Sequence, residues 1–324
     1  MYPILLDFGQ IKIYTYGVFV ALAFILATDY VSRVSEELKV DQRYIIDSII
    51  WLLIAGLLGT RIAYIIQNIG DYISDPVKII KIWEGGLAWY GGVILGILAV
   101  YLWSKKNKKN FLTTLDLVSL GVILGLSIGR WGCFSAGCCY GRPTDFFTSV
   151  VFKNTKSLAI QNVPIHPTQI YEAIGMFFVF AFTRGIMVGF KKSNSKILEL
   201  KTDIFLLIEL VLMRFYYLWY AKGISFPELV DIWFIPLFIF VFYVKKYLGI
   251  KIGEKINYFP GLISGIYFVS YGVLRFILEF LRDPSGLSGF IVDQLITGNH
   301  IISITIFFLG LYLLIFKGKE HQKI

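Results

Sequence analysis

The sequence predicts an all-α protein, a polytopic integral-membrane helical bundle that forms a single membrane domain over residues 1–324. Hydrophobic residues make up 56% of the chain, and the mean hydropathy is +0.69. A soluble protein of this length has too little interior to bury so much apolar surface. We count about nine apolar stretches that reach the ~20 residues a helix needs to cross a bilayer. These spans are expected near residues 14–33, 45–67, 86–103, 115–135, 168–190, 203–221, 229–246, 260–281 and 300–317.

Basic residues are divided unevenly between the two sets of alternating loops. The lysine-rich set lies near residues 33–43, 105–109, 191–201, 245–255 and 317–323. The positive-inside rule assigns this set to the cytoplasm, so the N-terminus is predicted outside and the C-terminus cytoplasmic. Because this topology accounts for the formal net charge of +9, nucleic-acid binding is not expected.

With this orientation, the first four spans each place a polar group in the outer half of the membrane. The first and third spans run inward and carry Tyr16 and Tyr90 near their outer ends. The second and fourth run outward, so Arg61 and Arg130 lie in their outer parts. An arginine at the centre of a membrane helix costs about 2.5–3.5 kcal/mol on insertion scales, and such residues usually mark function.

The fifth and eighth spans bring further polar groups to the same depth. The fifth begins at "HPTQIYEA", which puts His166 at the outer surface, with Gln169 and Glu172 one and two turns below it. The eighth contains "YGVLRFILEFLRDP", in which the spacing i, i+4, i+7 predicts one shared helical face. The residues on that face are Arg275, Glu279 and Arg282. Polar groups from six helices at one depth predict a polar cavity that opens to the outer leaflet.

The segment "WEGGLAWYGG" at the start of the third span is dense in glycine. Its paired glycines are Gly85, Gly86, Gly91 and Gly92. We interpret them as a broken helix start whose free backbone N–H groups face an anion. The alternative is helix packing, because small residues let helix backbones approach closely.

Two or three arginines that face the outer leaflet suit a phosphate group, because the guanidinium fork matches phosphate oxygens bidentately. Glu172 and Glu279 are expected to hold these forks, or one of them to take a proton. The sequence contains neither a nucleotide-binding loop nor a zinc motif, and no cofactor is expected. The residues alone therefore predict a membrane site for an anionic, lipid-borne phosphate.

The segments "GRWGCFSAGCCYG", "HPTQIYEA" and "YGVLRFILEFLRDP" resemble the prolipoprotein diacylglyceryl transferase family. "IYTYGVFVALAFILA", "LGTRIAYI" and "WEGGLAWYGG" resemble its earlier segments, in the same order, so that the family-like core covers residues 10–175 and 260–317. The resemblance implies transfer of a diacylglyceryl group from phosphatidylglycerol to the thiol of a prolipoprotein lipobox cysteine. It also implies a multi-pass protein of the bacterial cytoplasmic membrane that acts at the outer face. Residues 191–259 exceed what the family places there and are interpreted as an inserted helical hairpin.

The resemblance also implies site roles. Arg130 and Arg275 are expected to hold the lipid phosphate and stabilise the leaving charge. Other residues on family positions are Tyr16, Arg61, His166, Gln169, Glu172, Glu279 and Arg282. The catalytic set is expected to comprise Arg130, Arg275, Glu172, His166 and Tyr90.

The chain departs from the family pattern on the side of the lipid-accepting thiol. The family signature usually reads G-R-x-G-N-F-x-N-G-E, and here its polar positions hold Cys133, Ala136 and Cys138. Tyr90 stands where the family often has a histidine that is a candidate base for the incoming thiol. An unperturbed tyrosine, with a pKa of about 10, is a poorer base at neutral pH.

The three cysteines, Cys133, Cys138 and Cys139, are open to three interpretations. They pack as small, nearly apolar side chains, they form a redox or metal site, or one is an active thiol with a pKa lowered by Arg130. Cys133 and Cys138 are also candidates for substrate binding, since they occupy signature positions. Two alternatives to the transferase remain: a lipid-binding or lipid-moving membrane protein without catalysis, and a transferase with another acceptor.

Overall fold

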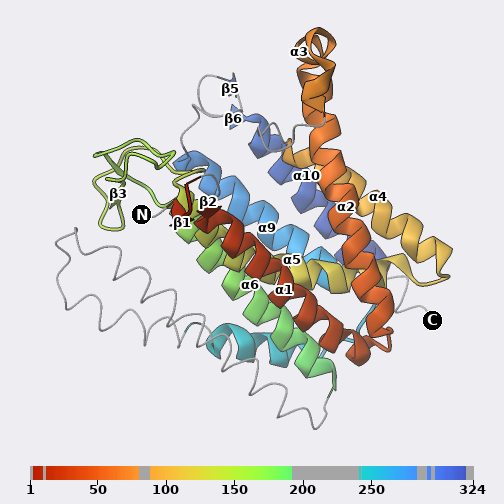
Figure 1. Ribbon diagram of the computed structural model, residues 1–324. Helices are drawn as coiled ribbons and strands as arrows, with labels where there is room; N and C mark the ends of the chain where they lie inside the picture. Colours follow the sequence, from red (N-terminus) through yellow and green to blue (C-terminus); the bar gives the residue numbers. More distant parts are fainter. Residues whose placement is uncertain are drawn as a thin grey trace. The chain divides into compact units, whose positions relative to one another are not determined.

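The computed structural model describes residues 3–9, 12–79, 88–191, 241, 243–282, 290–292 and 296–318, and these are mostly helical (Figure 1). Gly85, Gly86, the predicted sixth span and most of the seventh lie outside the described residues. The chain divides into two compact units. One comprises residues 1–24, 123–259 and 265–324, and the other residues 25–122 and 260–264. The single domain and its inserted hairpin stay predictions.

Six helices in the described part of the chain are long and apolar enough to cross a membrane. They are α1 (Thr15–Ser35), continued by the short η1 (Glu36–Leu38), α2 (Gln42–Gln67), α5 (Phe111–Ala136), α6 (Thr168–Lys191), α9 (Leu262–Leu281) and α10 (Gly298–Tyr312), continued by η4 (Leu313–Lys317). Only 17% of the most apolar window of α2 is buried within the protein, so most of that apolar helix is left for lipid to cover. The prediction of a polytopic helical membrane protein is confirmed.

The unit of residues 25–122 and 260–264 contains α2, α4 (Trp89–Lys106) and the short α3 (Ile69–Ser74) and η2 (Pro76–Ile79). Helices α2 and α4 lie side by side (Figure 1). Gly59 and Gly91 meet so closely that a side chain on either would overlap the carbonyl of the other. A side chain on Gly92 would in turn meet Thr60. Glycine here serves close backbone packing.

In the other unit, glycines also mark the helix contacts. A side chain on Gly132 in α5 would meet Tyr16 of α1, and one on Gly175 in α6 would meet Leu274 of α9. Gly272 of α9 lies against Ser303 of α10. These contacts bring α5, α6, α9 and α10, with the start of α1, into one bundle around the site described below.

Three short antiparallel pairs of strands correct the expectation of a purely helical fold. β1 (Ile4–Asp7) pairs with β2 (Lys12–Tyr14), β3 (Val150–Val151) with β4 (Pro164–Ile165), and β5 (Phe290–Val292) with β6 (Ile296–Thr297). β2, β4 and β6 directly precede or adjoin the first turns of α1, α6 and α10. Phe134, Phe152 and Ile165 of β4 belong to a small apolar core that gives the 137–167 loop a fixed base.

Candidate functional site

Glu172 lies between two arginines from different helices. Its Oε1 is 2.7 Å from Arg130 Nη2, and its Oε2 is 3.8 Å from Arg275 Nη1. Arg130 belongs to the end of α5, Glu172 to the second turn of α6 and Arg275 to the middle of α9. Glu172 is only 3% exposed, so the pairs are formed away from solvent, where charge interactions are strong.

Glu279 extends this arrangement toward α10. Arg275 Nη2 is 2.8 Å from Glu279 Oε2, as the i, i+4 spacing predicted. Glu279 Oε1 accepts hydrogen bonds from Thr297 Oγ1 at 3.1 Å and Asn299 Nδ2 at 2.9 Å. We call Arg130, Glu172, Arg275 and Glu279 the arginine–glutamate cluster.

Sequence reasoning missed Thr297 and Asn299. The signal was present in "TGNH", because Thr297 is the N-cap of α10 and its backbone N–H donates to His300 Nδ1 at 3.0 Å. A capping pattern at the start of an apolar span indicates where the helix begins. That start places the polar residues of the cap at the same end of the bundle as Glu279.

Two buried guanidinium groups in the cluster keep a donor that no acceptor satisfies. Among the described residues, Arg130 Nε and Arg275 Nη1 have no hydrogen-bond partner, and 3.8 Å is too long for a hydrogen bond from Arg275 to Glu172. Buried donors are normally satisfied, and an unsatisfied one costs about 1–3 kcal/mol. Arg282 lies close enough to interact electrostatically with Arg275. With two carboxylates and three guanidinium groups, this set has one positive charge in excess and suits an anion.

Backbone hydrogen bonds tie three segments together beside the cluster. Gly141 N donates to His166 O at 2.9 Å, and Arg142 N donates to Leu281 O at 2.8 Å. Arg142 Nε also donates to Arg282 O at 3.0 Å. The loop after α5, the entry to α6 and the end of α9 are therefore held in one place.

His166 lies at the entry to α6, outside the helix itself. Its Nδ1 is 3.4 Å from Tyr171 Oη, and Tyr171 Oη also contacts Thr148 Oγ1. Burial lowers the pKa of His166 below the ordinary value of about 6.5, so the imidazole is neutral at pH 7. A neutral imidazole has a free lone pair and is able to accept a proton. Tyr171 was not predicted from the sequence.

Two polar residues of the first turn of α6 hold the cysteine-containing turn. Gln169 Nε2 donates to Cys138 O at 2.6 Å, and Thr168 Oγ1 donates to Cys139 O at 2.8 Å. Gln169 is 1% exposed, and its Oε1 has no hydrogen-bond partner among the described residues. The structure thus gives Gln169 a positioning contact, and its predicted contact with substrate stays a prediction.

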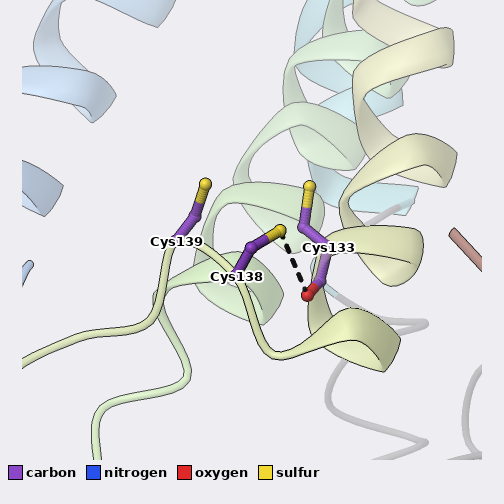
Figure 2. A group of neighbouring side chains, drawn as sticks. All are labelled: Cys133, Cys138 and Cys139. Atoms are coloured by element: carbon purple, nitrogen blue, oxygen red, sulfur yellow. Dashed lines mark hydrogen bonds between the residues drawn. The ribbon is translucent and has the colours of Figure 1, made fainter. Parts of the chain in front are cut away.

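The three cysteines lie close together as free thiols, with all Sγ atoms within 4.8 Å of one another (Figure 2). Arg130 Nη1 approaches Cys133 Sγ at 3.9 Å. Tyr16 lies within electrostatic range of all three thiols and of Arg130. The cysteine turn and the arginine–glutamate cluster are therefore neighbours through Arg130.

The two thiols beyond the end of α5 differ in acidity. Hydrogen bonding with Cys133 and Cys139 and burial raise the pKa of the Cys138 thiol. Hydrogen bonding with Cys133 and Cys138 lowers the pKa of the Cys139 thiol, and the positive charges of Arg282 and Arg130 lower it further. Burial of this thiol has the opposite effect and raises its pKa.

Four of the predicted site residues that the structure describes belong to the other unit, where it shows local contacts. Arg61 is 7% exposed, donates from Nε to Ile79 O at 3.2 Å and lies over the ring of Tyr72. Gly91 and Gly92 pack against α2, and the Gly91 amide donates to Ala88 O at 3.1 Å. Contrary to expectation, that amide is not a free N–H group, because α4 has already begun at Trp89. The catalytic role of Tyr90 stays a prediction, as do the roles of Arg61, Gly91 and Gly92 in substrate binding.

Comparison with known proteins places this arrangement in context. A family model described as prolipoprotein diacylglyceryl transferase matches residues 3–217 and 228–316. The phosphatidylglycerol–prolipoprotein diacylglyceryl transferase of Clostridium tetani is 31% identical over 307 residues, which cover 94% of each chain. The protein of the same name from Rickettsia conorii is 27% identical over 315 residues, which cover 96% of this chain and 95% of the relative. The family-model match spans the positions of the arginine–glutamate cluster.

Proposed function

The chain belongs to the prolipoprotein diacylglyceryl transferase family, and we propose that it transfers a diacylglyceryl group from phosphatidylglycerol to the lipobox cysteine thiol of a prolipoprotein. It is a membrane transferase of lipoprotein biosynthesis. Its place is the bacterial cytoplasmic membrane, crossed by about nine helices with the N-terminus outside, and the reaction takes place at the outer face.

The observation that carries the proposal is Glu172 between two arginines that each retain one buried, unsatisfied donor among the described residues. Arg130 Nε and Arg275 Nη1 are available to the oxygens of a lipid phosphate. Glu172 and Glu279 hold the two guanidinium planes through ion pairs at 2.7 Å and 2.8 Å. A donor set that is fixed before the substrate arrives stabilises developing charge without reorganisation.

The charge change in the reaction matches this site. The thiolate sulfur forms a bond to the glyceryl carbon that carries the phosphate, and the carbon–oxygen bond to that phosphate breaks. The electron pair of the broken bond stays on the phosphate oxygen. The phosphodiester of phosphatidylglycerol carries one negative charge, and the glycerol phosphate that leaves carries about two. Arg130, Arg275 and Arg282 are placed to stabilise the additional charge.

The thiol must lose its proton before or during attack, and His166 is the proposed base. Its pKa is lowered by burial, so it is neutral at pH 7 and able to accept that proton. Glu172 is the weaker candidate, because its two carboxylate oxygens already lie against Arg130 and Arg275, at 2.7 Å and 3.8 Å. Tyr171 holds the imidazole through its 3.4 Å contact with Nδ1.

Complementation of a strain depleted of its own transferase tests the proposal. The intact chain should restore growth and lipoprotein processing, whereas Arg275→Ala should not, although both reach the membrane in equal amounts. The alternative, a lipid-binding or lipid-moving protein without catalysis, is favoured by Cys133, Ala136 and Cys138 at family signature positions. Failure of the intact chain to restore processing, at normal abundance in the membrane, would support this alternative.

A further inference from the structure

The three cysteines of the chain converge on one point at the end of α5. Cys133 belongs to the last turn of the helix, and Cys138 and Cys139 follow directly after Gly137. Their Sγ atoms lie within 4.8 Å of one another and on the same side of the turn (Figure 2). The transferase reaction proposed above uses none of these thiols.

The backbone of this turn is shaped and held so that the sulfurs meet. Gly137 has φ +77° and Cys139 φ +58°, and the latter is a left-handed conformation that a residue with a side chain rarely adopts. Gly137 N and Cys138 N both donate to Cys133 O, at 2.9 Å and 3.1 Å. Together with the hydrogen bonds from Thr168 and Gln169 to the carbonyls of Cys139 and Cys138, these contacts fix the turn before any ligand binds.

Apolar packing does not explain this geometry. Cys138 and Cys139 are only partly buried, and all three Sγ atoms lie within 4.8 Å of one another. The Cys138 thiol also donates to Cys133 O at 3.7 Å. Packing requires neither a left-handed conformation at Cys139 nor three sulfurs within 4.8 Å of one another. Convergence of soft donors at a preformed turn is instead typical of thiolate coordination.

We propose that Cys133, Cys138 and Cys139 form a binding site for one soft, thiophilic d10 cation of the Cu(I) or Zn²⁺ class. Three metal–sulfur bonds form, and the three thiol protons pass to solvent. Metal–sulfur bonds of about 2.3 Å require sulfur–sulfur separations of roughly 4 Å, so closure from the observed spacing takes less than about 1 Å. Arg130 and Arg282 offset the negative charge of three thiolates around a cation of charge one or two.

Cadmium is a suitable probe, because its thiolate complexes absorb in the ultraviolet. The reduced, metal-free, full-length protein in detergent is titrated with Cd²⁺, and one equivalent should bind with a thiolate charge-transfer band. Because the chain has no other cysteine, C133S/C138S/C139S is a background control without thiols and should show no band. Each single Cys→Ser variant should bind at least about 10-fold more weakly, since one coordinate bond is lost. A wild-type signal no larger than that of the triple variant would overturn the proposal.

A second measurement uses only the wild-type protein and so does not depend on the folding of variants. One equivalent of Cd²⁺, and separately of Cu(I), should slow alkylation of all three thiols together, as read by mass spectrometry of the digested chain. Addition of a chelator should restore the original rates. Alkylation rates that stay unchanged, or protection of one thiol alone, would rule out a three-thiol site.

Discussion

Replacing Arg130 with lysine tests whether the shape of the guanidinium, as well as its charge, serves the reaction. Arg130 uses Nη2 for Glu172 at 2.7 Å and Nη1 for the 3.9 Å approach to Cys133, and its Nε is left for substrate. A lysine ammonium at this position keeps the charge but has one nitrogen, which cannot hold Glu172 and the phosphate in the same fixed geometry.

The expected loss follows from the contact that lysine cannot replace. A charge-assisted hydrogen bond in a desolvated site contributes about 1.5–3 kcal/mol, which corresponds to a roughly 10- to 150-fold slower transfer. Initial rates are measured with purified protein, phosphatidylglycerol and a lipobox peptide. The matched control is Arg33→Lys, because Arg33 forms an ion pair of 2.9 Å with Asp29 but its side chain is 57% exposed. That variant should stay within about twofold of wild type. If Arg130→Lys also stays within about twofold, the phosphate role of Arg130 is refuted.

Three further predictions concern stability, pH and topology. Glu172→Gln should lower the free energy of unfolding by about 3–5 kcal/mol, because it removes the carboxylate paired with Arg130 and leaves Arg275 with Glu279 alone. Asp29→Asn at an exposed pair should cost at most about 1 kcal/mol, and equal losses in chemical denaturation would contradict this. Because the pKa of His166 is lowered, the transfer rate should be constant near neutral pH and fall only below about pH 6.5, where the imidazole gains a proton. A His166→Gln variant whose rate still falls in this acid range would exclude His166 as the base. In a cysteine-free background, a cysteine at position 153 should be labelled from outside intact cells and one at position 108 should not, and the reverse result would invert the topology.

The sequence predicted those features of the site that depend on spacing within one helix. Arg275 and Glu279 are four residues apart in an apolar span, so an ion pair on one helical face follows from helix geometry. The expectation that Glu172 holds an arginine fork also agrees with its 2.7 Å contact to Arg130, because a buried charge in a membrane helix needs a partner.

Features that depend on tertiary contacts were out of reach of sequence patterns. The bonds of Glu279 to Thr297 and Asn299 form between separate helices, and no periodicity links these positions. Gly91 was interpreted as part of an anion site, whereas its close approach to Gly59 depends on a partner helix that the segment itself does not reveal. Likewise, the left-handed conformation of Cys139 has no signal in "SAGCCYG".

Direct observation of the transferred group tests the central claim. The purified protein is incubated with phosphatidylglycerol vesicles and a lipobox peptide, and both products are followed by mass spectrometry. The peptide should gain a diacylglyceryl group on its cysteine sulfur while an equal amount of glycerol phosphate is released, and Arg130→Ala should abolish both. An intact protein that binds phosphatidylglycerol but leaves the peptide unmodified would contradict the assignment of Arg130, Glu172 and Arg275 to a transferase site.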